Sequence, residues 1–155
     1  MNLKVGDKAP EFNLPASNGQ NISLKDYQGK KNVVLYFYPK DDTPGCTVEA
    51  CGFRDSIKVF EKQDAVILGV SADNVASHEK FIKKFDLPFV LLSDTAKKMC
   101  EDYGVMVEKN MYGRKYIGIA RMTFVINKDG RIAQIFEKVK PEGHPDEVFS
   151  ALKKI

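Results

Sequence analysis

The stretch VVLYFYPKDDTPGC, residues 33–46, joins a buried strand to the start of a helix. Its first six residues are apolar or aromatic without a break, as expected of a strand that is covered on both faces. Thr43 suits the N-cap position and Pro44 the first helical position, and helical periodicity continues to about Lys62. Cys46 is therefore predicted in the first turn of a helix that follows a central strand.

Strands and helices alternate along the rest of the chain. Further strands are predicted at 65–71 and 89–92, a hairpin at 122–127 and 132–139, helices at 75–85, 94–103 and from Pro145 to about Lys154, a strand pair within 1–31 and a loop at 108–118. This order predicts an α/β fold with a mixed central sheet flanked by helices and an N-terminal strand extension, an order that resembles thioredoxin-like folds.

Length and charge narrow the classes of function. The 155 residues fit a single domain, 1–155, and the formal net charge of +3 comes from scattered residues. Basic blocks never exceed two residues, which argues against nucleic-acid binding. No apolar run approaches the length of about 20 residues that crosses a membrane, and residues 1–8 lack the apolar segment of a signal peptide. These features predict a cytoplasmic protein without a membrane partner.

The first turn of the predicted helix is an electropositive place for Cys46. Free backbone N–H groups and the positive end of the helix dipole favour a thiolate there. The alternative is a buried cysteine that acts as a small hydrophobic residue. Three cysteines in a cytoplasmic protein favour chemistry or burial over a disulfide scaffold.

The segment PKDDTPGC, residues 39–46, reads P-x-x-x-T-x-x-C and resembles the active-site signature of peroxiredoxins. Its continuation to Cys51, TPGCTVEAC, is similar to the Q type (bacterioferritin comigratory protein) subfamily. Similar blocks follow the family's order nearly from end to end: VGDKAPEF at 5–12, DLPFVLLSD at 86–94 and RMTFVINKDG at 121–130.

This resemblance implies an enzyme, a thiol peroxidase. Cys46 would reduce hydrogen peroxide or an organic hydroperoxide and become a sulfenic acid. Cys51 would condense with it to an intramolecular disulfide, which a thioredoxin-like dithiol protein would reduce. The resemblance implies no cofactor, and it favours a monomer.

Ionisation of a thiol alone gives only a few-fold gain in rate, because a more acidic thiol is also a weaker nucleophile. Most of the acceleration must come from donors that stabilise charge on the peroxide oxygens. Candidates are the backbone N–H groups of Gly45 and Cys46 and the Thr43 hydroxyl. The resemblance adds Arg121 as the cation and Pro39 as a shield of the thiolate; by themselves these residues would be a surface charge and a strand terminator.

Helix geometry separates the two cysteines of this pair. Cys51 lies about 140° around the helix from Cys46, on the polar side, with the Cα atoms roughly 8.6 Å apart. A disulfide needs Cα atoms within about 7 Å. The bond therefore requires the first turns to unwind, which Gly45 and Gly52 make easier.

The third cysteine and a second arginine near Cys46 are interpreted as structural residues. Cys100 shares an apolar helical face with Ala96, Met99 and Tyr103 and is predicted to be a core residue rather than a second redox site. Arg54 is a weaker candidate for the cation and is interpreted as a helix-face charge.

His78 and His144 are not spaced with a cysteine as a metal-binding pair. We therefore predict no metal site, a surface or helix-packing role for His78, and a solvated turn at Asp41-Asp42.

Two other functions remain as alternatives on the same fold. A general thiol–disulfide oxidoreductase usually carries C-x-x-C, whereas four residues separate Cys46 from Cys51. A metallochaperone could use two cysteines and a histidine. A peroxide-consumption assay and a metal analysis separate these two from a peroxidase.

Overall fold

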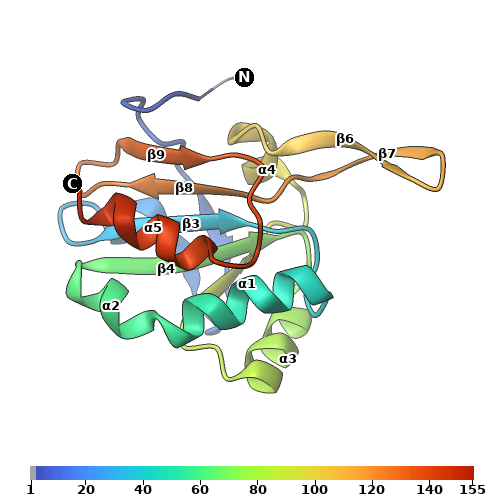
Figure 1. Ribbon diagram of the computed structural model, residues 1–155, viewed down its shortest axis with the longest axis horizontal. Helices are drawn as coiled ribbons and strands as arrows, with labels where there is room; N and C mark the ends of the chain where they lie inside the picture. Colours follow the sequence, from blue (N-terminus) through green and yellow to red (C-terminus); the bar gives the residue numbers. More distant parts are fainter. Residues whose placement is uncertain (1–2) are drawn as a thin grey trace.

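The computed structural model describes residues 3–155, so the first two residues of the predicted N-terminal extension lie outside the described part. A five-stranded sheet with the order β5-β4-β3-β8-β9 forms its centre (Figure 1). The strands are β3 (Asn32–Phe37), β4 (Ala65–Ser71), β5 (Val90–Ser93), β8 (Met122–Ile126) and β9 (Ile132–Phe136). β3, β4 and β5 run parallel, and β8 and β9 are antiparallel to their neighbours. The mixed sheet is confirmed.

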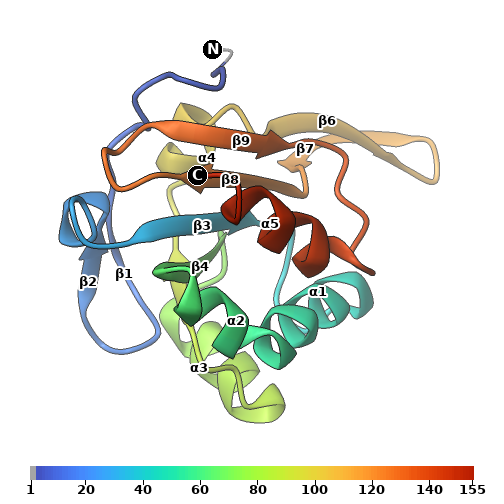
Figure 2. The same cartoon turned by 60° about the vertical axis from the view of Figure 1, so that its left-hand side comes forward.

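Two hydrophobic cores fill the two faces of this sheet. The helices are α1 (Pro44–Asp55), α2 (Ile57–Lys62), α3 (Val75–Phe85), α4 (Lys98–Asp102) and α5 (His144–Leu152). Side chains of α1, α2, α3 and α5 share one core, and side chains of α4 share the other with the N-terminal segment. Figure 2 shows α1, α2 and α5 together on one side of the sheet.

The apolar run of β3 supplies both cores. Val33, Leu35 and Phe37 belong to the core on the α4 side. Val34 and Tyr36, which point the other way along the strand, belong to the core beneath α1 and α5. All five side chains are buried, as predicted for a strand covered on both faces.

The N-terminal extension is a short strand pair, as predicted. β1 (Asn13–Pro15) and β2 (Asn21–Ser23) are antiparallel and lead into the 3₁₀ turn η1 (Leu24–Asp26). Ala16, which follows β1, forms an antiparallel bridge with Leu92 of β5 and so attaches the pair to the main sheet.

The loop prediction for residues 108–118 is wrong. This segment forms a hairpin of β6 (Met106–Met111) and β7 (Arg114–Ile119), which extends away from the body of the molecule in Figure 1. Most of its residues are exposed on both faces, so no alternation of polar and apolar residues marks the strands. The turn is Tyr112-Gly113, and both residues have positive φ as a two-residue hairpin turn requires.

Two predicted helices are shorter than expected. The helix from residue 44 to 62 is interrupted at Ser56, which separates α1 from α2. The helix predicted at 94–103 is reduced to α4, because Lys97 adopts a left-handed conformation before it. The Asp94 carboxylate accepts a 2.8 Å hydrogen bond from the backbone N–H of Cys100 and so fixes the start of this short helix.

Within residues 3–155, no helix combines the length and the apolar character that crossing a membrane requires.

Candidate active site

Cys46 lies in the first turn of α1, directly after the loop that leaves β3. Thr43 occupies the N-cap position with an extended backbone, and Pro44 follows at the start of the helix, as predicted. The Cys46 side chain is only 1% exposed, and its thiol is free. The helix therefore directs a buried thiol towards the end of the sheet, beside its own free N–H groups.

Arg121 reaches this thiol from the opposite part of the chain. It stands between β7 and β8, and its Nη2 donates to the Cys46 Sγ at 3.3 Å. A Cβ at Gly45 would lie 3.0 Å from the same Nη2, so the glycine leaves the space that the guanidinium occupies. The structure brings together the cysteine and the cation that the resemblance implied.

Glu49 completes this cluster, and our sequence reasoning missed it. Its Oε1 accepts from the Arg121 Nη1 at 2.7 Å, and its side chain is fully buried. The signal was present, because Glu49 lies three positions after Cys46 on the buried stripe of α1 with Ala50 and Phe53. A charged residue on a buried stripe needs a partner, which here comes from residue 121.

The electrostatics of the cluster follow from burial and charge. Burial raises the pKa of Glu49 to about 7, although the positive charge of Arg121 and its hydrogen bond oppose this rise. Burial by itself would lower the pKa of Arg121, but the negative charges of Glu49 and Cys46 outweigh it and raise that pKa. The guanidinium is thus a permanent cation shared between a carboxylate and a sulfur.

Thr43 and Pro39 shape the loop in front of the thiol. The Thr43 hydroxyl donates to the backbone carbonyl of Lys40 at 2.9 Å, so in this state its proton is directed into the loop. Thr43 thus occupies the N-cap position as predicted, but its side chain makes no capping hydrogen bond to α1. Pro39 is half-buried at the end of the β3 segment.

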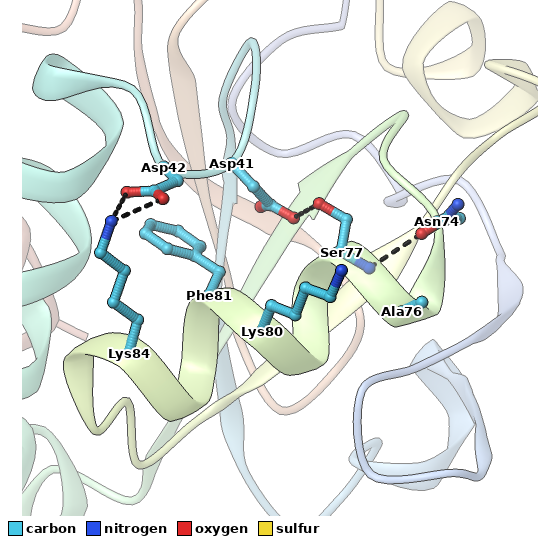
Figure 3. A pocket seen from close by; sticks show the side chains of 8 residues that line it. All are labelled: Asp41, Asp42, Asn74, Ala76, Ser77, Lys80, Phe81 and Lys84. Carbon is cyan, nitrogen blue, oxygen red and sulfur yellow. Dashed lines mark hydrogen bonds and ion pairs between the residues drawn. The ribbon is translucent and has the colours of Figure 1, made fainter.

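The prediction of a solvated turn at Asp41-Asp42 is wrong for Asp41. Its carboxylate accepts hydrogen bonds from the Tyr38 hydroxyl at 2.6 Å and from the Ser77 hydroxyl at 2.8 Å. The His78 Nδ1 lies 2.8 Å from the same carboxylate. Only Asp42 is exposed, where it pairs with Lys84 (Figure 3).

His78 is fully buried, so the surface alternative for this residue is also wrong. Its Nε2 lies 2.9 Å from the Leu92 carbonyl, which can only accept, so Nε2 carries a hydrogen. Asp41 and Asp73 lie close enough to His78 to form a metal-ligand set. Hydrogen bonds within the protein already use these groups, which explains the cluster without a metal.

The other two cysteines differ in their surroundings. Cys51 is half-buried on the same continuous helix as Cys46, and its thiol is free. Cys100 is fully buried in the core on the other side of the sheet, which agrees with its structural interpretation. Arg54 donates to the Phe85 carbonyl at 2.7 Å and holds α1 against the end of α3, so it acts as a structural charge.

A groove of about 510 Å³ opens beside the first turn of α1. Its apolar lining comes from Pro44, Val48 and Pro141, and Gly45 contributes backbone. The groove thus lies on the side of Gly45 and Pro141, next to the Arg121 guanidinium.

Comparison with known proteins assigns the chain to a family. Residues 5–135 match the model of the AhpC/TSA family. The chain belongs to the AhpC/TSA family. It is 54% identical over 152 residues to the putative peroxiredoxin bcp of Coxiella burnetii, a match that covers 98% of this chain and 100% of the relative.

Two solved structures extend this finding to the fold. A cysteine-to-serine mutant of PrxQ from Xylella fastidiosa superposes with a TM-score of 0.93 at 38% identity, and the match covers 99% of this chain and 98% of that one. The bacterioferritin comigratory protein of Xanthomonas campestris, studied for alkyl peroxide reduction in trapped intermediate and ligand complexes, gives 0.87 at 43% identity, covering 92% and 90%.

These matches confirm the peroxiredoxin resemblance, its Q type, and the thioredoxin-like fold of AhpC/TSA proteins. The protein is a thiol peroxidase of this family.

Proposed function

We propose that Cys46 is the nucleophile that reduces hydroperoxides and that Cys51 resolves the product. The observation that carries this assignment is the 3.3 Å contact between the Arg121 Nη2 and the Sγ of a free, buried Cys46. A cation in hydrogen-bond contact with a sulfur at a helix start favours the thiolate, which is the reactive form.

In the first step the Cys46 thiolate attacks one oxygen of the hydroperoxide. The S–O bond forms as the O–O bond breaks, the sulfur is oxidised to a sulfenic acid, and the other oxygen leaves as an alkoxide or hydroxide that takes a proton. Arg121 and the backbone N–H groups of Gly45 and Cys46 stabilise the charge on the leaving oxygen. Thr43 would orient the peroxide once its hydroxyl turns from Lys40, and Pro39 would limit access of water.

In the second step the Cys51 sulfur attacks the sulfenic sulfur and water leaves, which forms the Cys46–Cys51 disulfide. Both residues lie in the continuous helix α1. Helix geometry holds their Cα atoms roughly 8.6 Å apart, too far for the bond. The first turns of α1 must therefore unwind, and a thioredoxin-like dithiol protein then reduces the exposed disulfide.

The groove beside Gly45 favours organic hydroperoxides as substrates in addition to hydrogen peroxide. Its apolar residues Pro44, Val48 and Pro141 offer contact area for an alkyl group beside Gly45, the residue that precedes Cys46. The Xanthomonas campestris relative reduces alkyl peroxides, which agrees with this assignment. We further propose that the chain works as a single-domain monomer in the cytoplasm.

The test is stopped-flow reduction of hydrogen peroxide and of an alkyl hydroperoxide by wild type, Cys46→Ser and Cys51→Ser. We expect no reaction for Cys46→Ser, because a hydroxyl lacks the acidity and polarisability of a thiol. With a thioredoxin-like dithiol protein as the reductant, Cys51→Ser should reduce one equivalent of peroxide and then stop, because the Cys46–Cys51 disulfide that this protein reduces cannot form. Full turnover by Cys46→Ser would place the nucleophile elsewhere.

A further inference from the structure

The peptide unit that joins Lys40 to Asp41 is held by hydrogen bonds on both sides. Its carbonyl, which belongs to Lys40, accepts the 2.9 Å hydrogen bond from the Thr43 hydroxyl. Its N–H, which belongs to Asp41, donates to the Asp73 Oδ2 at 2.8 Å. The two groups of a trans peptide lie in one plane and point in opposite directions. Asp73 therefore sets the direction of the carbonyl that binds Thr43.

Asp73 is itself fixed at the end of a central strand. Its Oδ2 also accepts a 2.7 Å hydrogen bond from the hydroxyl of Ser71, the last residue of β4. The backbone N–H of Asp73 donates to the same Ser71 oxygen at 3.2 Å. Ser71 is fully buried, so the acceptor that Asp73 offers to the loop is tied to the central sheet.

The Asp41 side chain anchors the same peptide to α3 and β5. Its Oδ2 accepts from the Ser77 hydroxyl at 2.8 Å (Figure 3) and lies 2.8 Å from the His78 Nδ1. A hydrogen must lie between this nitrogen and the carboxylate, because two lone pairs at this distance would repel each other. The His78 Nε2 bonds the Leu92 carbonyl, so His78 bridges β5 and the loop. Asp41 and His78 are both buried, where water competes little for these bonds.

These anchors determine where the Thr43 oxygen lies. Among residues 3–155, the bond to the Lys40 carbonyl is the one hydrogen bond that the Thr43 side chain makes. A hydroxyl can turn its hydrogen towards a peroxide without moving its oxygen, whereas the oxygen moves if the side-chain torsion changes. The direction of the Lys40 carbonyl thus decides where a peroxide would meet Thr43.

We propose that Asp73 is a positioning residue for peroxide binding, which acts through the Lys40–Asp41 peptide to hold the Thr43 oxygen at the start of α1. The proposal rests on the proposed function, in which Thr43 orients the peroxide and Cys46 attacks it. Asp73 needs no contact with the substrate. A displacement of about 1 Å in a positioning group can lower a rate by up to about 100-fold, so a distant carboxylate can matter.

The test follows sulfenic acid formation at Cys46 by stopped flow in a Cys51→Ser background with hydrogen peroxide. Asp73→Ala leaves the Asp41 N–H without its acceptor, and we expect the rate constant to fall about tenfold or more. Asp73→Asn keeps an oxygen that can accept both hydrogen bonds, and its rate should stay within about twofold of the background protein. Ser71→Ala loosens Asp73 without removing it and should give a smaller fall.

Lys84→Met is the matched control. It breaks the exposed ion pair of Asp42, the next residue of the same loop, and leaves the Lys40–Asp41 peptide untouched. The rate of sulfenic acid formation should not change.

A double-mutant cycle with Thr43→Val shows whether Asp73 acts through Thr43. Valine keeps the shape of the side chain and removes the hydroxyl, so Thr43→Val and Asp73→Ala together should react as slowly as Thr43→Val alone. Alkylation of Cys46 by iodoacetamide does not depend on the orientation of a peroxide. Asp73→Ala should therefore be alkylated at the rate of the background protein, which a general disturbance of the thiol would not allow.

An unchanged rate of sulfenic acid formation in Asp73→Ala would overturn the proposal, as would effects of Asp73→Ala and Thr43→Val that multiply. An equal loss in Cys46 alkylation, or a loss in Asp73→Asn as large as in Asp73→Ala, would also overturn it. Failure of the proposed function is distinguishable, because Thr43→Val alone would then react at the background rate or peroxide reduction would survive Cys46→Ser.

Discussion

Arg121 and Cys46 are 75 positions apart in the sequence, yet the Arg121 Nη2 and the Cys46 Sγ lie 3.3 Å apart. Two features of the fold produce this contact. β8 pairs with β3 in the central sheet, so the residue before β8 lies beside the loop that follows β3. Gly45 leaves room for the guanidinium in the first turn of α1. The same guanidinium donates to Glu49, which fixes its plane.

Replacing Arg121 should slow peroxide reduction far more than a change in thiol ionisation could. We expect Arg121→Ala to lose about 100-fold or more in the rate of sulfenic acid formation, the usual effect of removing a donor to transition-state charge. Arg121→Lys should recover only part, since one ammonium cannot donate to Cys46 and Glu49 as a fork. Stopped-flow kinetics measures the rate of sulfenic acid formation, and Arg131→Ala, at an exposed position, is the control. Full activity in Arg121→Lys would show that donation to both Cys46 and Glu49 is not required.

Glu49 should make the stability of the fold depend on pH. Its pKa is raised by burial from 4.5 to about 7. A carboxyl whose pKa is higher in the folded state stabilises the fold fully below its unfolded pKa, and this contribution is lost as the pH rises through the folded pKa. We expect the free energy of unfolding to fall by a few kcal/mol between about pH 4.5 and pH 7.5 in wild type.

Urea unfolding across this pH window checks the expectation. Glu49→Gln should flatten the pH dependence, because the amide does not titrate. The exposed Glu142→Gln is the control and should follow wild type. If Glu49→Gln keeps the full slope, another group causes it.

Cys100→Ala should leave peroxide turnover nearly intact. Cys100 is buried on the far side of the sheet, and burial raises its pKa well above that of an ordinary thiol, so it stays protonated and unreactive. The substitution opens a small cavity and should cost about 1–2 kcal/mol in the free energy of unfolding. A loss of turnover without a loss of stability would reveal a redox role.

The unwinding of α1 predicts different hydrogen exchange in the two redox forms. Residues 46–51 should lose protection when the Cys46–Cys51 disulfide forms. Phe53, which is fully buried and stacks on Tyr36 with ring centroids 4.9 Å apart, should hold the second half of the helix in place. The helix α3 is the internal control and should exchange equally in both forms. Equal protection of residues 46–51 in both forms would exclude unwinding.

Gly52 has a packing role that the sequence did not reveal. Because glycine weakens a helix, the sequence alone suggests that Gly52→Ala would stiffen α1 and slow disulfide formation. In the structure, a Cβ at Gly52 would lie 2.9 Å from the Cγ of Pro145. The methyl would push α1 away from α5 and destabilise the fold, so this variant does not test helix stiffness.

The elements that the sequence predicts well are those with one dominant local signal. The apolar run of β3 and the Thr43-Pro44 helix start both depend on neighbouring residues alone. The β6–β7 hairpin was missed because its exposed faces give no periodicity, and its Tyr112-Gly113 turn is a less familiar pair than Asp-Gly. Local patterns are thus informative where at least one face of an element is buried.

The site depends on partners from distant segments, and sequence spacing does not reveal them. Asp41 resembled a solvated turn because Ser77 and His78, which bury it, arrive from α3. The burial of Glu49 is explained by its hydrogen bond from Arg121. The role of Arg121 was itself predicted from the family resemblance and not from its position in the sequence.

The roles of Cys46 as nucleophile and Cys51 as resolving thiol can be read from the mass of the peptides around both residues after wild type reacts with one equivalent of hydrogen peroxide. We expect a Cys46–Cys51 crosslink with the loss of two hydrogen atoms, and in Cys51→Ser the gain of one oxygen atom on Cys46 alone. Oxidation at Cys100, or oxygen gained at Cys51 while Cys46 remains a free thiol, would contradict these roles.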